Sequence, residues 1–125
     1  MDDRLRKEAG RAGEAAALAY LQRAGLQLML RNFRCKAGEI DLVMLDGTTL
    51  ALVEVRYRSS EQFGGAAASV TWRKQRRLVH AAEYLLLAHP QLCRYSARFD
   101  VVAISTAPQC TVDWIKGAFD AGNDG

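Results

Sequence analysis

Two apolar runs separated by Asp46-Gly47 form the segment GEIDLVMLDGTTLALVEVRYR, residues 38–58. An Asp-Gly pair between such runs indicates a hairpin of two strands, over residues 39–45 and 49–57. Both faces of these strands are apolar, which is typical of a sheet covered by helices on both sides. Charged residues nevertheless interrupt the runs, and burying a charge is unfavourable unless it is paired or binds a metal. They are Glu39, Asp41, Glu54 and Arg56.

The alternation of strand side chains brings these charges together. Glu39 and Asp41 share one face of the first strand, and Glu54 and Arg56 share one face of the second. A four-residue loop over 46–49 sets Asp41 opposite Glu54, whereas a two-residue loop sets Glu39 opposite Glu54. Opposed carboxylates repel unless one is protonated or a cation lies between them. Both registers therefore predict an oxygen-rich site of the kind that Mg²⁺ or Mn²⁺ accepts.

A helix is expected over about residues 4–24, and it carries a further acid toward the sheet. Glu14 precedes Leu18 and Leu21 at helical spacing, so it extends their apolar stripe by one turn. We predict that Glu14 points at the acidic site. A role in capping or pairing near the start of the helix stays open.

A second helix is expected over about residues 70–88, closed by Pro90. Its apolar stripe of Leu78, Ala81 and Leu85 begins, at the same spacing, with Lys74. Lys74 therefore either faces the acidic site or extends its amine to solvent, and the spacing alone does not decide between the two.

Positive charge gathers near this helix and around the hairpin. The net charge is +3, and the run WRKQRR over 72–77 holds four cations and no acid. Such clusters suit a polyanion, although a solvated surface is the commoner explanation of a charge run. Aromatic residues beside the cations, among them Tyr57 and Phe63, could stack on bases, but we predict that Trp72 packs against the protein. The predicted nucleic-acid-binding residues are Arg58, Arg73, Arg76 and Arg77.

The remaining segments complete one domain over residues 1–125. Strands are expected over 26–33, 98–105 and 111–115, with a loop over 59–69 and a frayed tail over 119–125. The fold class is α/β, with a mixed central β-sheet flanked by helices in the order α-β-β-β-α-β-β. Asp100 is expected to pair with Arg98 or with a cation on a neighbouring strand, and it is left out of the acidic site. The chain shows neither a membrane-spanning run nor a signal peptide, and its three widely spaced cysteines indicate reduced thiols in a cytoplasmic protein.

Several blocks between about Glu14 and Trp114 resemble a known family. GEID, VEVRYRSS, FGGAAASVTWRKQRRL and RFDVVAI follow one another as in the bacterial YraN-type proteins, whose biochemical function is unassigned. That family is similar to the PD-(D/E)XK, or restriction-endonuclease-like, superfamily and especially to archaeal Holliday-junction resolvases. The resemblance implies a helix glutamate, a strand aspartate and a Glu-x-Lys motif, which map onto Glu14, Asp41 and Glu54-Val55-Arg56. It also implies Mg²⁺-dependent cleavage of phosphodiesters, with the metal held by these acids.

Arg56 departs from this pattern because it stands where the superfamily has lysine. Arginine is always charged and cannot act as a base, but it could stabilise charge on a phosphate, and Lys74 could supply the missing amine. The leading hypothesis is a metal-dependent nuclease for branched or recombining DNA, with Mg²⁺ or Mn²⁺ on Glu14, Asp41 and Glu54. A homodimer would match a two-fold symmetric junction. The alternatives are an inactive nucleic-acid-binding module and a protein-interaction scaffold. The predicted catalytic residues are Asp41, Glu54, Arg56 and Lys74.

Overall fold

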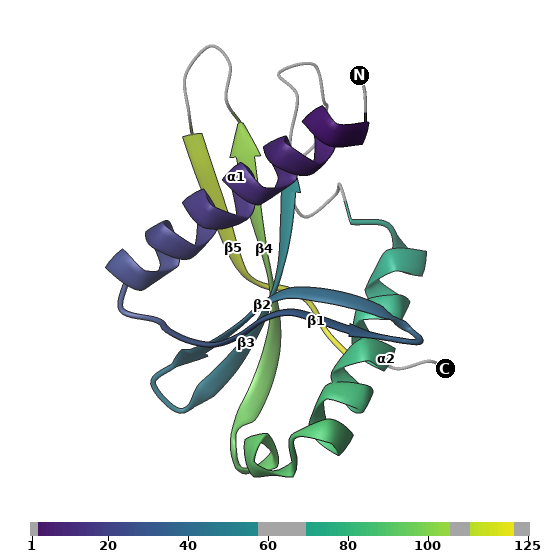
Figure 1. Ribbon diagram of the computed structural model, residues 1–125. Coiled ribbons are helices and arrows are strands. Elements are labelled where there is room, and N and C mark those ends of the chain that lie inside the picture. The colour runs from purple at the N-terminus through teal and green to yellow at the C-terminus, as the bar shows by residue number, and fades with distance from the viewer. Residues whose placement is uncertain (1–2, 58–69, 106–110, 122–125) are drawn as a thin grey trace.

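The computed structural model describes residues 3–57, 70–105 and 111–121, with side chains described from residue 11 onward within these ranges. Arg58, Phe63, Cys110, the predicted loop over 59–69 and the last part of the predicted tail lie outside the described residues. The predicted order α-β-β-β-α-β-β is confirmed (Figure 1). The elements are α1 (Asp3–Arg23), β1 (Gln27–Cys35), β2 (Gly38–Asp46), β3 (Thr49–Tyr57), α2 (Trp72–Ala88), the 3-10 helix η2 (Pro90–Arg94), β4 (Ser96–Ser105) and β5 (Thr111–Phe119).

The five strands form one mixed sheet whose spatial order, β1-β2-β3-β4-β5, repeats their order in the chain. β3 and β4 pair in parallel, and the other three neighbouring pairs are antiparallel. The parallel pair requires a crossover connection, and α2 lies within it. Within the described residues, neither long helix carries an apolar stretch that could cross a bilayer.

The helices cover opposite faces of the sheet, as the apolar strands predict. Ala17 and Leu21 of α1 belong to one buried cluster with strand residues that include Leu42 and Val53. Leu78 and Leu85 of α2 belong to a second cluster, which includes alternate strand residues. The fold class is therefore as predicted, with a five-stranded mixed sheet flanked by helices, and it is consistent with a restriction-endonuclease-like fold.

The hairpin between β2 and β3 has the register predicted for the four-residue loop, but its loop is shorter. Leu45 pairs with Leu50 and Asp46 with Thr49, so only residues 47 and 48 connect the two strands. Gly47 has a φ of 63° there, a left-handed conformation that glycine adopts without strain. Of the two registers considered, this is the one that directs Asp41 toward Glu54.

Pairing between β2 and β3 stops at Leu42 and Val53. Beyond that point β2 pairs only with β1, while β3 continues beside β4 as far as Tyr57. In Figure 1 the β1–β2 end of the sheet runs toward α2, whereas β3 continues past the N-terminal half of α1. The sheet thus opens between its second and third strands, at the end where the charged residues lie.

The end of the chain differs from the prediction. β5 extends to Phe119, four residues past the predicted limit at 115, and Phe119 pairs with Phe99 and stacks on it at 4.9 Å between ring centroids. The prediction that fraying begins at residue 119 is therefore wrong. The strand continues because an irregularity in its pairing, with Gly117 at a φ of 59°, carries the chain past a break in the ladder.

Candidate functional site

The Asp41 side chain bridges β2 and β3 where the sheet opens between them. The Val55 N–H, which has no partner on β2 here, donates to Asp41 Oδ2 at 2.8 Å, so the carboxylate takes the place of a ladder carbonyl. Asp41 and Glu54 line one cavity of about 260 Å³ there. The remaining lining residues are Gly38, Glu39, Lys74, Arg77 and Leu78.

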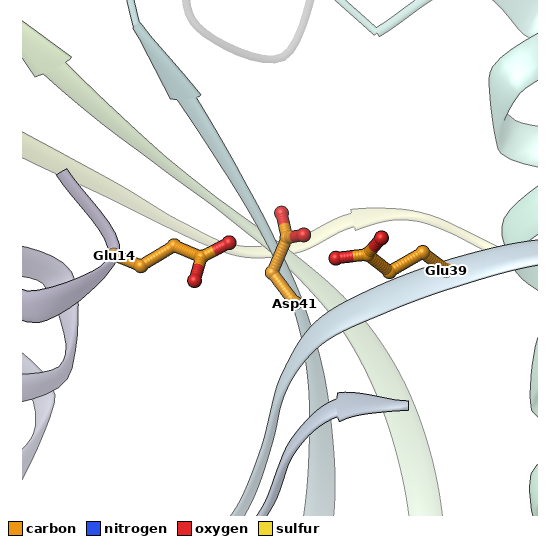
Figure 2. Close-up of side chains that lie close together, drawn as sticks. All are labelled: Glu14, Glu39 and Asp41. Atoms are coloured by element: carbon orange, nitrogen blue, oxygen red, sulfur yellow. The ribbon is translucent and has the colours of Figure 1, made fainter. Parts of the chain in front are cut away.

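Three carboxylates converge at this opening (Figure 2). Glu14 of α1 and Glu39 of β2 point toward Asp41 from either side, and one oxygen from each acid lies within 4.8 Å of the others. α1 can approach so closely because residue 13 is glycine: a Cβ there would lie 2.5 Å from Tyr57 Cε2. Close packing of Gly13 against Tyr57 therefore keeps α1 near enough to the sheet for Glu14 to reach the site.

Asn32 joins two of these acids, and it is not among the residues predicted for the site. Oriented with its amide nitrogen toward the acids, Asn32 donates to Glu39 Oε1 at 3.0 Å and to the two Glu14 carboxylate oxygens at 3.2 and 3.3 Å. Its φ of 51° is left-handed, and among the described residues it is the one non-glycine residue with positive φ. Asparagine is uncommon in strands and tolerates the left-handed conformation. An asparagine within a predicted strand is therefore the one sequence signal that could have pointed to this residue.

Glu54 is nearly enclosed, with 7% of its side chain exposed, and it is paired with Lys74. Lys74 Nζ lies 3.2 Å from Glu54 Oε1, so the lysine faces the sheet and does not extend its amine to solvent. Arg56 lies close enough to lower the pKa of Glu54, and its buried Nε has no hydrogen-bond partner among the described residues. Arg56 does not line the cleft, so its positive charge acts on the site through its proximity to Glu54.

Burial and crowding shift the protonation of the two central acids. Burial, followed by the negative charge of Glu54, raises the pKa of Asp41 to about 8, against the Val55 hydrogen bond, which lowers it. Burial also raises the pKa of Glu54, although Lys74 and Arg56 oppose that rise. In the absence of a cation, the site therefore holds a proton near neutral pH.

The donor set suits a divalent cation. All three converging groups offer carboxylate oxygens, the ligands that Mg²⁺ and Mn²⁺ prefer, and a cation would relieve the repulsion that raises the pKa of Asp41. The predicted metal ligands are Glu14, Asp41 and Glu54. The three acids that converge in the structure include Glu39 in place of Glu54. Glu39 also accepts from Arg34 Nε at 3.2 Å, so this member of the acidic group is a salt-bridge partner as well. Glu54 as a ligand stays a prediction.

Comparison with known proteins assigns the chain to a family. The model of the uncharacterised protein family UPF0102 matches residues 13–104. The chain belongs to the UPF0102 family. A UPF0102 protein of Xanthomonas euvesicatoria is 53% identical over 116 residues, covering 93% of this chain and 94% of the relative. One of Ectopseudomonas mendocina is 53% identical over 112 residues, which are 90% and 94% of the two chains. One of Pseudomonas syringae is 49% identical over 123 residues, covering 97% of this chain and all of the relative.

The predicted nucleic-acid-binding arginines of this UPF0102 protein differ in their surroundings. Arg77 lines the cleft, and Arg73 is exposed one turn earlier. Arg76 instead donates from Nη1 to the Ala121 carbonyl at 3.0 Å, beyond the end of β5. Trp72 is 71% exposed, so the prediction that it packs against the protein is wrong. Trp72 is the first residue of α2 and belongs to neither buried apolar cluster.

A second buried acid lies elsewhere in the sheet of this UPF0102 protein. Asp100 on β4 is fully buried and accepts from Arg98 Nε at 2.9 Å, which confirms the predicted pairing. It also accepts from Trp114 Nε1 at 3.0 Å and from the Gly117 N–H at 2.9 Å. Arg98 in turn donates to Asp46 Oδ2 at 2.9 Å. This network ties β4 to β5 and lies apart from the acidic cleft.

Proposed function

We propose that this UPF0102 protein is a divalent-metal-dependent nuclease that hydrolyses phosphodiesters in DNA, in the cytoplasm, with branched or recombining DNA as its substrate. The observation that carries the proposal is the convergence of acids at the opening of the sheet. Glu14, Glu39 and Asp41 meet there, with Glu54 and Lys74 in the same cleft. The resemblance to the PD-(D/E)XK superfamily supports it, and a homodimer would present two such sites to a two-fold symmetric junction.

The acids supply the metal site. Asp41 and Glu14 hold Mg²⁺ or Mn²⁺, with the remaining oxygens coming from Glu39 or Glu54. When bound, the cation lowers the pKa of a water molecule and neutralises charge on the scissile phosphate. The Val55 hydrogen bond fixes the Asp41 carboxylate at the centre of this set. Asn32 keeps Glu14 and Glu39 together.

The cations act on the substrate and on Glu54. Lys74 Nζ pairs with Glu54 and, by shifting from it, can reach a water or a leaving oxygen in the same cleft. Arg56, which lies close enough to Glu54 to lower its pKa, stabilises negative charge that develops on a phosphate in the cleft. This division of roles gives the lysine on α2 the function that the superfamily assigns to a lysine at the position of Arg56.

Cleavage assays test the proposal directly. The wild type is incubated with four-way-junction, single-stranded and duplex DNA, with Mg²⁺, with Mn²⁺ and with a chelator. We expect metal-dependent cleavage, which Glu54→Gln lowers by roughly 10²-fold or more. Glu83→Gln, an exposed position on α2, is the matched control and should cleave as the wild type does. Metal-independent cleavage, or full activity of Glu54→Gln, would contradict the proposal.

Arg56 also favours a second candidate, a nucleic-acid-binding module without catalysis. An arginine at the lysine position cannot exchange a proton near neutral pH. DNA binding without cleavage under all these metal conditions would favour the module. Failure to bind either metal or DNA would instead favour a protein-interaction scaffold.

A further inference from the structure

An exposed aromatic side chain stands at the beginning of α2. Trp72 is the first residue of the helix, directly after the N-cap Thr71, whose side-chain oxygen accepts the Lys74 N–H at 3.2 Å. The cap fixes the first turn and therefore the direction of the indole. At 71% exposure, the ring contributes little to the core. A large rigid ring held toward solvent is a common feature of binding surfaces.

The charges around Trp72 are of one sign. The first turns of α2 hold Arg73, Lys74, Arg76 and Arg77 and no acid. Cations are unfavourable there, because the N-terminus of a helix carries partial positive charge. The arrangement lowers the stability of the helix and creates a positive potential that a polyanion would neutralise. The Arg76 guanidinium lies 5.9 Å from the centre of the Trp72 ring and adds a cation–π contact to it.

The same turns connect the ring to the acidic cleft. Lys74, two residues after Trp72, reaches Glu54, and Arg77 lines the cleft wall. Trp72 and Lys74 lie only about 3 Å apart along the helix axis but about 200° apart around it, and Arg73 and Arg77 project between these two directions. A strand whose phosphates follow Arg73 and Arg77 into the cleft would therefore pass the indole.

We propose that Trp72 stacks on an unpaired base of a DNA strand whose backbone is bound by Arg73 and Arg77 as it enters the cleft. Aromatic side chains next to backbone-binding cations are the usual means of holding single strands, because every base offers a flat π-face. Bases within a duplex are already stacked on their neighbours. The inference deepens the proposed function, on which it rests, by narrowing the substrate to DNA with a single-stranded or splayed segment near the cut.

Binding measurements without metal test the stacking contact separately from catalysis. Labelled single-stranded DNA and a duplex of the same sequence are titrated with chelator present. We expect Trp72→Ala to weaken single-strand binding roughly 5- to 150-fold and duplex binding much less. Trp72→Phe should retain most of the affinity because it keeps a ring. The matched control is Leu87→Ala, which removes a 78% exposed apolar side chain near the other end of α2 and should change neither affinity.

Fluorescence gives a second readout on the ring itself. Trp114→Phe leaves Trp72 as the one tryptophan, since the chain has two. In that background, single-stranded DNA should quench the emission as the base stacks. A thermal melt checks that the background remains folded without the Trp114 hydrogen bond to Asp100. The affinity comparison of Trp72→Ala with Leu87→Ala does not depend on this background.

The outcomes separate the two proposals. Unchanged single-strand affinity in Trp72→Ala, or an equal loss with duplex, would overturn the stacking contact, while metal-dependent cleavage by the wild type would still support the nuclease. Selective loss of single-strand binding, without cleavage by the wild type in Mn²⁺, would support stacking and contradict the nuclease. If the wild type binds no DNA, the stacking proposal is wrong and the surface belongs to a protein partner.

Discussion

Asp41 and Asp100 lie on strands of the same sheet, and their surroundings are opposite in chemistry. Asp100 receives hydrogen bonds from Arg98, Trp114 and Gly117. Asp41 receives one from Val55 and is otherwise close to acids, whose charges help to raise its pKa to about 8. A buried carboxylate surrounded by donors is satisfied within the fold. A carboxylate surrounded by other carboxylates needs a proton or an external cation.

The difference distinguishes a structural acid from a functional one. Asp100 compensates a defect in the sheet, since it accepts the Gly117 N–H where the β4–β5 pairing is irregular. Asp41 does the same for the Val55 N–H at the opening of the sheet, but with only one of its oxygens. The geometry therefore leaves part of Asp41 available for a ligand and none of Asp100.

The largest expected effect comes from removing the charge of the structural acid. Asp100→Asn replaces one acceptor oxygen by an NH₂ group, which would face the donors of Arg98, Trp114 or Gly117. We expect a loss of about 3–5 kcal/mol in the free energy of unfolding, because Asp100 is fully buried and the half-buried Arg98 would keep only Asp46 as an ion-pair partner. Urea denaturation measures it, with Glu83→Gln as a control expected to stay within about 0.5 kcal/mol. A change below about 1 kcal/mol would show that Asp100 is not the structural acid of this comparison.

The next largest effect is the pH dependence of the free energy of unfolding that Asp41 produces. Its pKa of about 8 in the folded protein lies above the ordinary value of 3.8. The folded protein therefore keeps a proton that the unfolded chain releases. Without metal, this contribution to stability is complete below about pH 4 and is lost as the pH rises to about 8, with a slope of up to about 1.4 kcal/mol per pH unit.

Asp41→Asn should flatten this slope, because the amide stays neutral and its oxygen can still accept from Val55. It should also abolish Mn²⁺ binding, which in the wild type should strengthen as the pH rises toward 8. Urea melts from pH 5 to pH 9 and calorimetric Mn²⁺ titrations measure the two effects. If both proteins had the same pH profile, or if the variant bound Mn²⁺ as tightly as the wild type, Asp41 would not be a functional acid.

Asn32 offers a smaller and more selective perturbation of the acidic cleft. Asn32→Ala and Asn32→Gly both remove the amide between Glu14 and Glu39, but only alanine is strained at a φ of 51°. We expect alanine to be less stable than glycine by about 1–2 kcal/mol. Thermal melts of the metal-free proteins measure the difference. Equal stabilities would mean that the left-handed conformation does not persist in solution.

The smallest effect separates two neighbouring arginines. Arg77 lines the acidic cleft, whereas Arg76 donates to the Ala121 carbonyl. Each phosphate contact contributes roughly −0.9 to the log–log slope of duplex affinity against salt. Arg77→Ala should therefore flatten the slope by about one unit, and Arg76→Ala by clearly less. Salt titrations of DNA affinity measure both, and equal slopes for the two variants would refute the distinction.

Much of the cleft follows from periodicity alone. The alternation of strand residues directs Asp41 and Glu54 to one face, and helical spacing directs Glu14 and Lys74 toward the sheet. These patterns depend only on residues near one another in the sequence. The order of helices and strands follows from the same local signals.

Other features depend on contacts between distant segments. The position of Asn32 beside two acids requires the β1–β2 register and a left-handed residue within a strand. The length of β5 depends on a hydrogen bond from Gly117 to Asp100, 17 residues earlier. The exposure of Trp72 depends on how α2 packs as a whole. Local propensity carries no information on these contacts, so each was missed or wrongly predicted.

The sheet also has a consequence for the order of assembly, because its spatial order repeats the order of the chain. β1, β2 and β3 form a meander of short-range pairings, whereas the parallel β3–β4 pair closes only after α2 has formed its crossover. Local pairings have the lower loop-closure entropy and tend to form early. Glu39, Asp41 and Glu54 would then meet before Lys74 arrives to neutralise any of them. Charge repulsion thus becomes a kinetic barrier on the path to the native state, and it is lower in mildly acidic solution, where Asp41, with a pKa of about 8 in the folded protein, takes up a proton.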